Sequence, residues 1–244
     1  MALIAPMAEW HPLTRPMSTT PLTHDVICLH TMVGTLEGSW SWSNRPGGTY
    51  WHFGIGGDGE TWQCQDLRYR SAANLNGNWH VIPIETEDTN RGVFPTPWAD
   101  PLWTEAQLDA IARLTAWLCV RFNIPPVLIP DTLPGRRGIG FHQQGIDPVR
   151  VPGGEKWSNA VGKTCPARRR SQVQEVIRRV QAIINPEDGD LPLNAADKQW
   201  IYQSVTEILR KEGISSGVAW LKQKTADIDT DVEIIKADLA DDGT

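Results

Sequence analysis

Apolar runs rich in β-branched residues alternate with glycine- and proline-rich segments along the first part of the chain. Residues 25–31 read Asp-Val-Ile-Cys-Leu-His-Thr, with the length and composition of a buried strand that ends in a histidine. Residues 49–56 and 60–65 have strand composition and flank the glycine-rich segment 56–59, whose glycines suit the positive φ angles of a tight turn. The pattern therefore predicts a buried strand followed by a β-hairpin.

A further strand is predicted over residues 81–86, where the sequence Val-Ile-Pro-Ile-Glu-Thr is again β-branched and apolar. Pro83 has no N–H to donate to a β-ladder, so we expect this strand to lie at a sheet edge or to contain a bulge.

Helical periodicity predicts a long packing helix that begins at Thr104. Gln107 lies three residues further on and completes a capping-box pattern. The apolar positions that recur at helical spacing are Leu108, Ile111, Ala112, Thr115, Leu118 and Cys119. The segment 123–141 that follows is dense in Pro and Gly and predicts a long irregular connection to His142.

A second helix is expected to run to about Ile184. Pro166 suits its first position, which would place Cys165 at or near the N-cap. Amide groups and the helix dipole at that end would favour a thiolate.

These elements predict an α/β fold with a mixed central sheet flanked by helices. The composition changes after residue 186: residues 187–244 hold 13 of the 29 acidic residues but only 6 of the 23 basic ones. We therefore predict a domain over residues 1–186, a linker over 187–194 and a helical C-terminal element over 195–244.

The C-terminal element carries apolar positions spaced alternately three and four residues apart, the a/d rhythm of about three heptads. They are Val218, Leu221, Thr225, Ile228, Val232, Ile235 and Leu239. Packing within the chain is the plainer explanation, but a strict 3.5-residue period favours a supercoiled partner. The element is thus expected to form a homo-oligomer or to bind the substrate.

The net charge of −6 and the near-neutral first domain give no indication of nucleic-acid binding. No apolar run is long enough to insert in a membrane, and the first residues lack the basic and apolar regions of a secretion signal. Four cysteines allow two disulfides by number, but Cys28 and Cys119 lie in apolar stretches, so reduced thiols are expected.

Three residues far apart in the sequence have the chemistry of metal ligands. His142 and Cys165 offer an imidazole and a thiol, and His30 at the end of its predicted strand is the best third donor. Two histidines and one thiolate leave a fourth position open on a tetrahedral zinc ion, as a hydrolytic site requires. We therefore expect Zn²⁺ at His30, His142 and Cys165.

The ordered set of His30, residues 50–55 (Tyr-Trp-His-Phe-Gly-Ile), Gly57-Asp58-Gly59, His142 and Lys163-Thr164-Cys165 resembles a known family. It is similar to the zinc-dependent N-acetylmuramoyl-L-alanine amidases related to peptidoglycan recognition proteins, notably phage endolysins. No single motif in the set is decisive, because the signal lies in its order and spacing.

The resemblance spans roughly residues 20–185 and implies hydrolysis of the amide between the lactyl group of N-acetylmuramic acid and L-alanine of bacterial peptidoglycan. Zinc would lower the pKa of a bound water toward about 7. Glu85 would act as general base and acid, and Lys163 would stabilise the oxyanion. Another branch of the family uses a tyrosine where this chain has Trp51; Tyr50 is displaced by one residue and so faces the opposite side of its strand.

The chain's 12 tryptophans suggest aromatic contacts to sugar rings. Trp51, Asn74 and Trp40 are the substrate-binding candidates, whereas His52 is expected to be a packed strand histidine. The resemblance further implies a phage protein held in the cytoplasm of the infected host until it reaches the wall. The alternative is a non-catalytic peptidoglycan-binding module with a structural zinc, against which the presence of Glu85, Lys163 and Cys165 argues.

Overall fold

The computed structural model describes residues 2–88 and 102–185. The chain divides into two units, Met1–Leu191 and Pro192–Thr244, and every described residue belongs to the first. The predicted linker over 187–194 and the helical element over 195–244 lie outside the described residues, so both stay predictions.

The described part is built on one six-stranded mixed sheet with the order β1-β4-β3-β5-β2-β6. The strands are β1 (Glu9–Trp10), β2 (Val26–Thr31), β3 (Phe53–Ile55), β4 (Thr61–Gln63), β5 (Val81–Thr86) and β6 (Gly138–Phe141). The predicted hairpin forms the antiparallel pair β3–β4, and all other neighbouring strands run parallel. The prediction of a mixed sheet in an α/β fold is therefore confirmed.

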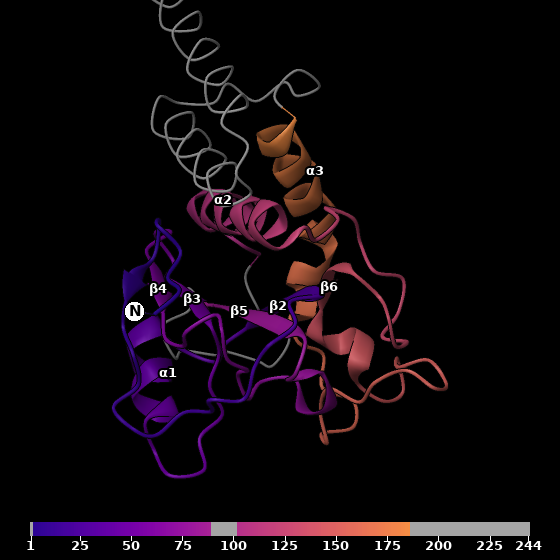
Figure 1. Cartoon of the computed structure of the whole chain (residues 1–244). Coiled ribbons are helices and arrows are strands. Elements are labelled where there is room, and N and C mark those ends of the chain that lie inside the picture. Colours follow the sequence, from indigo (N-terminus) through magenta and orange to yellow (C-terminus); the bar gives the residue numbers. More distant parts are fainter. Residues whose placement is uncertain (1, 89–101, 186–244) are drawn as a thin grey trace, which may run out of the picture. The chain divides into compact units, whose positions relative to one another are not determined.

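Helices lie on both sides of this sheet, α2 and α3 on one side and α1 on the other (Figure 1). The α-helices are α1 (Leu36–Ser43), α2 (Glu105–Phe122) and α3 (Val173–Ile184). Three short 3-10 helices are η1 (Leu75–Gly77), η2 (His142–Gly145) and η3 (Ala167–Gln172). The predicted capping box is present at α2: the Thr104 hydroxyl accepts from the Gln107 N–H, and the Gln107 side chain accepts from the Thr104 N–H.

The expected edge position of β5 is wrong, since this strand lies inside the sheet between β3 and β2. Pro83 pairs with Cys28 of β2, but the ladder with β3 begins only at Ile84. No β3 residue therefore stands opposite Pro83. A short neighbouring strand lets a proline occupy an interior position without interrupting a second ladder.

The predicted start of the last helix at Pro166 is also wrong. The segment after Cys165 forms η3, and α3 begins only at Val173. Ala167 adopts a left-handed φ of 56°, which is incompatible with a continuous α-helix from Pro166. This irregular start turns the Arg169 side chain into the interior, where it is fully buried.

All four cysteines are free and buried, as expected for reduced thiols. Among the helices of the described residues, none has the length and apolarity to cross a membrane.

Candidate metal centre and active site

The parallel strands β5, β2 and β6 bring the candidate functional residues to the same end of the sheet, where these strands have their carboxyl ends. His30 on β2 stands in register with Glu85 on β5. Leu29 pairs with Phe141, the last residue of β6, so His142 follows directly beside His30. Open α/β sheets commonly bind their ligands at the carboxyl ends of parallel strands. The register of three strands thus assembles a site from residues more than 100 positions apart.

Cys165 reaches this end of the sheet from the loop before η3. Its carbonyl accepts a hydrogen bond from the Gln143 N–H at 2.8 Å. Its Sγ accepts from the Thr31 N–H at 3.3 Å, directly after His30 on β2. These two contacts tie the cysteine to the segments that carry both histidines.

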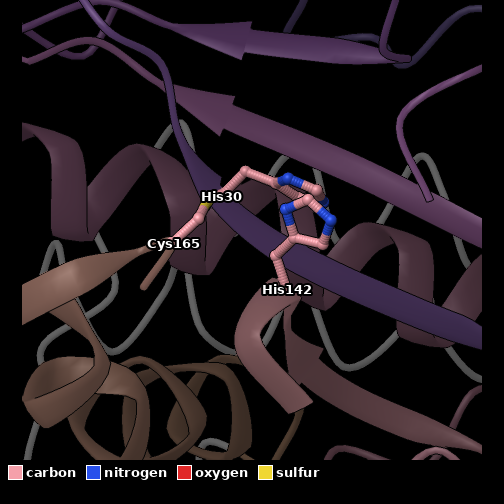
Figure 2. A group of neighbouring side chains, drawn as sticks. All are labelled: His30, His142 and Cys165. Carbon is pink, nitrogen blue, oxygen red and sulfur yellow. The ribbon is translucent and has the colours of Figure 1, made fainter. Parts of the chain in front are cut away.

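The donor atoms of His30, His142 and Cys165 lie within 4.8 Å of one another, and all three residues are buried. Figure 2 shows the two imidazole rings facing each other with Cys165 beside them; the ring centroids are 4.2 Å apart. The group could hold a metal ion, and two imidazoles with one thiolate suit zinc.

A hydrogen bond at Nε2 fixes the orientation of the His142 ring. Its Nε2–H donates to the Trp157 carbonyl at 3.0 Å, while its buried Nδ1 has no hydrogen-bond partner. A buried nitrogen without a partner is costly unless something binds it. The Nδ1 atom of His142 is therefore a free donor that a metal ion would satisfy.

Burial keeps both imidazoles neutral, the form in which they bind metals. It lowers the pKa of His142 to about 4, with Lys163 adding to the effect. It also lowers the pKa of His30 well below its ordinary value, helped by His142 and then Lys163. The thiol of Cys165 shows the converse, since burial raises its pKa to about 12. Cys165 also does not stand at an N-cap, since η3 follows it with Pro166 as the cap. Metal binding would therefore have to displace the thiol proton.

Glu85 is the acid/base candidate of the site. Its Oε1 lies 3.3 Å from His30 Nδ1, and 18 % of its side chain remains exposed. Burial raises the pKa of Glu85 to about 7, although the positive charges of Lys163 and Arg169 oppose the shift. A carboxyl group that titrates near neutral pH can both accept and return a proton.

A pocket of about 640 Å³ lies at this end of the sheet and is lined by both Glu85 and Lys163. Of the three predicted substrate-binding residues, only Trp51 lines it. The remaining lining residues are Thr31, Met32, Val33, Gly34, Thr35, Gly38, Ser39, Trp42, Ser43, Arg45 and Thr49. Trp42 and Arg45 extend the pocket from the end of α1. Trp42 is one of the tryptophans for which contacts to sugar rings are expected, whereas nothing in the sequence distinguishes Arg45 from its neighbours.

Trp40 and Asn74 lie elsewhere. The Trp40 indole donates to the His11 carbonyl at 3.1 Å, and this residue is absent from the pocket lining. The Asn74 side chain is fully buried, which argues against direct contact with a substrate. His52 is a packed histidine, as expected, with Nε2 2.8 Å from the Tyr69 carbonyl. Tyr50 also stays out of the pocket, and its hydroxyl accepts from the Ser18 N–H.

Arg169 is a structural element of the site that the sequence reading missed, because Arg168-Arg169-Arg170 reads as a solvated basic face. Its guanidinium donates to the Thr31 hydroxyl, to the hydroxyl and carbonyl of Thr86, and to the Glu87 carbonyl. It therefore ties the carboxyl ends of β2 and β5 together, directly after His30 and Glu85.

Comparison with known proteins finds solved structures that are similar to this chain. A structure of the Staphylococcus aureus hydrolase AmiA with its ligand matches with 17% identity and a TM-score of 0.51, over 74% of this chain and 86% of that one. The N-acetylmuramoyl-L-alanine amidase LysC from Clostridium intestinale URNW matches with 15% identity and a TM-score of 0.45, over 70% and 97%. No curated protein matches the chain.

The family model of N-acetylmuramoyl-L-alanine amidases, Amidase_2, matches residues 20–168. This range contains every residue of the metal centre and the pocket described above. The chain belongs to the N-acetylmuramoyl-L-alanine amidase family.

Proposed function

We propose that the chain is a zinc-dependent peptidoglycan amidase whose metal is held by His30, His142 and Cys165. One observation carries the proposal: three buried donors converge next to Glu85, which lines an open pocket together with Lys163. A structural zinc site is normally closed by four protein ligands. Among the described residues this group has three, which fits a catalytic site with one open position.

The residues around the donors supply the remaining needs of amide hydrolysis. Glu85 accepts a proton from the attacking water and returns it to the departing amine. Lys163 supplies a compact positive charge for the oxyanion of the tetrahedral intermediate. Zinc bound at the three donors would activate the water and polarise the scissile carbonyl.

The pocket fits a substrate that has both polar and apolar parts. Trp51 and Trp42 offer aromatic surface, and Arg45 adds a second positive charge to that of Lys163. We propose that the pocket binds the lactyl group and the first residues of the stem peptide, with the amide between them at Glu85 and the metal donors.

The biological setting follows from the same proposal. An enzyme that cuts this bond separates the stem peptides from the glycan strands and so weakens the wall. We propose a role in bacterial lysis, as an endolysin held in the cytoplasm of an infected host before it reaches the wall.

The predicted element over residues 195–244 would add a second function to the chain. We propose that it joins copies of the protein, which presents several amidase domains to one wall and increases avidity. Light scattering on the full chain and on a chain ending at Asn185 tests this. An oligomer that becomes a monomer on truncation supports the proposal, and a monomeric full-length chain contradicts it.

Digestion of purified cell walls tests the amidase function. The expected products are glycan strands with free lactyl carboxyl groups and peptides with an N-terminal L-alanine, identified by mass analysis. A chelator should abolish their release, and added zinc should restore it. The matched control is Glu85→Gln, which keeps the size of the side chain but removes the base. Wall binding without product release would instead support the non-catalytic binding module.

A further inference from the structure

The side chain of Asn74 does not cap the helix that this residue precedes. It precedes η1, and asparagine at a helix N-cap normally uses its side-chain oxygen to cap the helix. Here the side chain makes no such bond. The backbone is held on both sides instead: the Asn74 N–H donates to Asn78 Oδ1 at 2.7 Å, and its carbonyl accepts from the Gly77 N–H at 2.7 Å. The backbone of Asn74 is therefore fixed, and its side-chain amide is available for another contact.

The amide points at the face of β2 that carries the metal ligand. Asn74 Nδ2 donates to Cys28 Sγ at 3.3 Å. Cys28 and His30 are two residues apart on one strand, so their side chains project from the same face of the sheet. Because Nδ2 is engaged by Cys28, the other end of the amide, Oδ1, is left for a neighbour of Cys28 on that face.

Two buried atoms at this place have no hydrogen-bond partner, Asn74 Oδ1 and His30 Nε2. One is an acceptor, and the other carries the proton in the tautomer whose Nδ1 is free. Such atoms are rare in protein interiors and call for a specific explanation. His30 Nδ1 lies on the other side of the ring and faces Glu85.

We propose that Asn74 is a positioning residue for the metal ligand His30: its Oδ1 accepts a hydrogen bond from His30 Nε2–H and so presents Nδ1 to the metal. This inference rests on the metal site of the proposed function. Metal-bound histidines commonly donate their second N–H to such an acceptor, which fixes both the tautomer and the ring orientation.

Two further observations agree with this role. The Asn74 side chain is close enough to His30 to raise the pKa of this histidine, although the larger effect of burial lowers it. The two atoms do not form a hydrogen bond as they stand, and the soft terminal torsion of an amide allows the Asn74 side chain to rotate. The second ligand has the equivalent arrangement, with His142 Nε2 on the Trp157 carbonyl. Both imidazoles would thus be held at Nε2 and offered at Nδ1.

Zinc affinity, measured by competition with a chromophoric chelator and without peptidoglycan, tests the proposal. Asn74→Leu keeps the size of the side chain but removes the acceptor, and should weaken zinc binding about 10- to 100-fold. Asn74→Asp retains an acceptor and should bind zinc at least as tightly as the wild type. Cys28→Ala removes only the other partner of the amide and serves as the control, with an affinity within about threefold of wild type.

A measurement on the unmodified protein covers the case in which Asn74→Leu does not fold. Long-range ¹H–¹⁵N spectra of the zinc-loaded wild type should show His30 protonated at Nε2. Protonation at Nδ1 would overturn the proposal, as would equal zinc affinity in folded wild-type and Asn74→Leu proteins. A wild-type chain that binds no zinc would overturn the proposed function as well, so the two failures are distinguishable.

Discussion

His30 and Glu85 stand in register on the neighbouring parallel strands β2 and β5, with His30 Nδ1 3.3 Å from Glu85 Oε1. One residue of this pair is a candidate metal ligand and the other the candidate base. Strand pairing therefore fixes the separation between them, and no mobile loop is needed to bring them together. The first prediction concerns the division of labour in this pair.

Glu85→Gln should keep zinc binding intact and lower the rate of wall hydrolysis roughly 100-fold or more, as loss of a general base commonly does. The amide cannot accept the proton but fills the same space. Turnover on purified walls and zinc content by elemental analysis are the two measurements. Near-wild-type turnover in a folded, zinc-loaded Glu85→Gln protein would assign the base elsewhere.

Lys163→Met should lower turnover on the order of 100-fold, because it removes the positive charge expected to stabilise the oxyanion. Zinc content should change little, since Lys163 is not a donor. Lys156→Met is the matched control: Lys156 does not line the pocket, and its substitution should leave turnover unchanged. Equal effects of the two substitutions would contradict the assigned role of Lys163.

Gly145→Ala should destabilise the fold by about 1–3 kcal/mol, the usual cost of overpacking a close contact. A Cβ atom at this position would clash with Cγ of the buried Trp157. The Trp157 N–H also donates to the Gly145 carbonyl, and its own carbonyl holds His142. Denaturant unfolding should show the loss, and zinc affinity should fall with it. A variant as stable as the wild type would show that Trp157 can shift freely.

Acid should destabilise the fold through Glu175 of α3. The Arg179 guanidinium donates to Glu175 of its own helix and to Glu105 and Asp109 of α2. Hydrogen bonds from Arg178 and then Arg179 lower the pKa of Glu175 to about 2, from an ordinary value of 4.5. The folded state thus binds this proton less readily than the unfolded state does.

The sign of the effect follows from linkage. The contribution of Glu175 is fully present above pH 4.5 and is lost as the pH falls from 4.5 toward about 2. Unfolding free energy measured across this range should decline less steeply in Glu175→Gln than in the wild type. Equal slopes would show that the ion pairs contribute nothing to stability.

The three candidate metal ligands could be singled out from the sequence, whereas the sheet position of one strand could not. His30 was identifiable because a β-branched run ends in a histidine, and Cys165 because a lysine precedes it by two residues. The interior position of β5 was not predictable, since Pro83 is tolerated only because β3 is too short to reach it. That fact belongs to the register between strands rather than to the strand itself.

Arg169 and Asn74 show the same limit for side chains. Arg169 lies in a run of three arginines, and only the left-handed turn at Ala167 and the irregular start of η3 bury it. Asn74 was proposed as a substrate contact, whereas its buried amide lies beside Cys28. Neither environment leaves a periodic signal in the sequence, because each depends on contacts with residues far away along the chain.

The content of zinc per chain, measured by elemental analysis of the purified protein, tests the central claim most directly. The account predicts about one zinc in the wild type, as three protein donors around one open position hold a single ion. Cys165→Ser should lose most of it, whereas Cys119→Ser, which alters a buried thiol of α2 outside the donor group, should retain it. Full zinc content in Cys165→Ser would contradict the His30, His142 and Cys165 site.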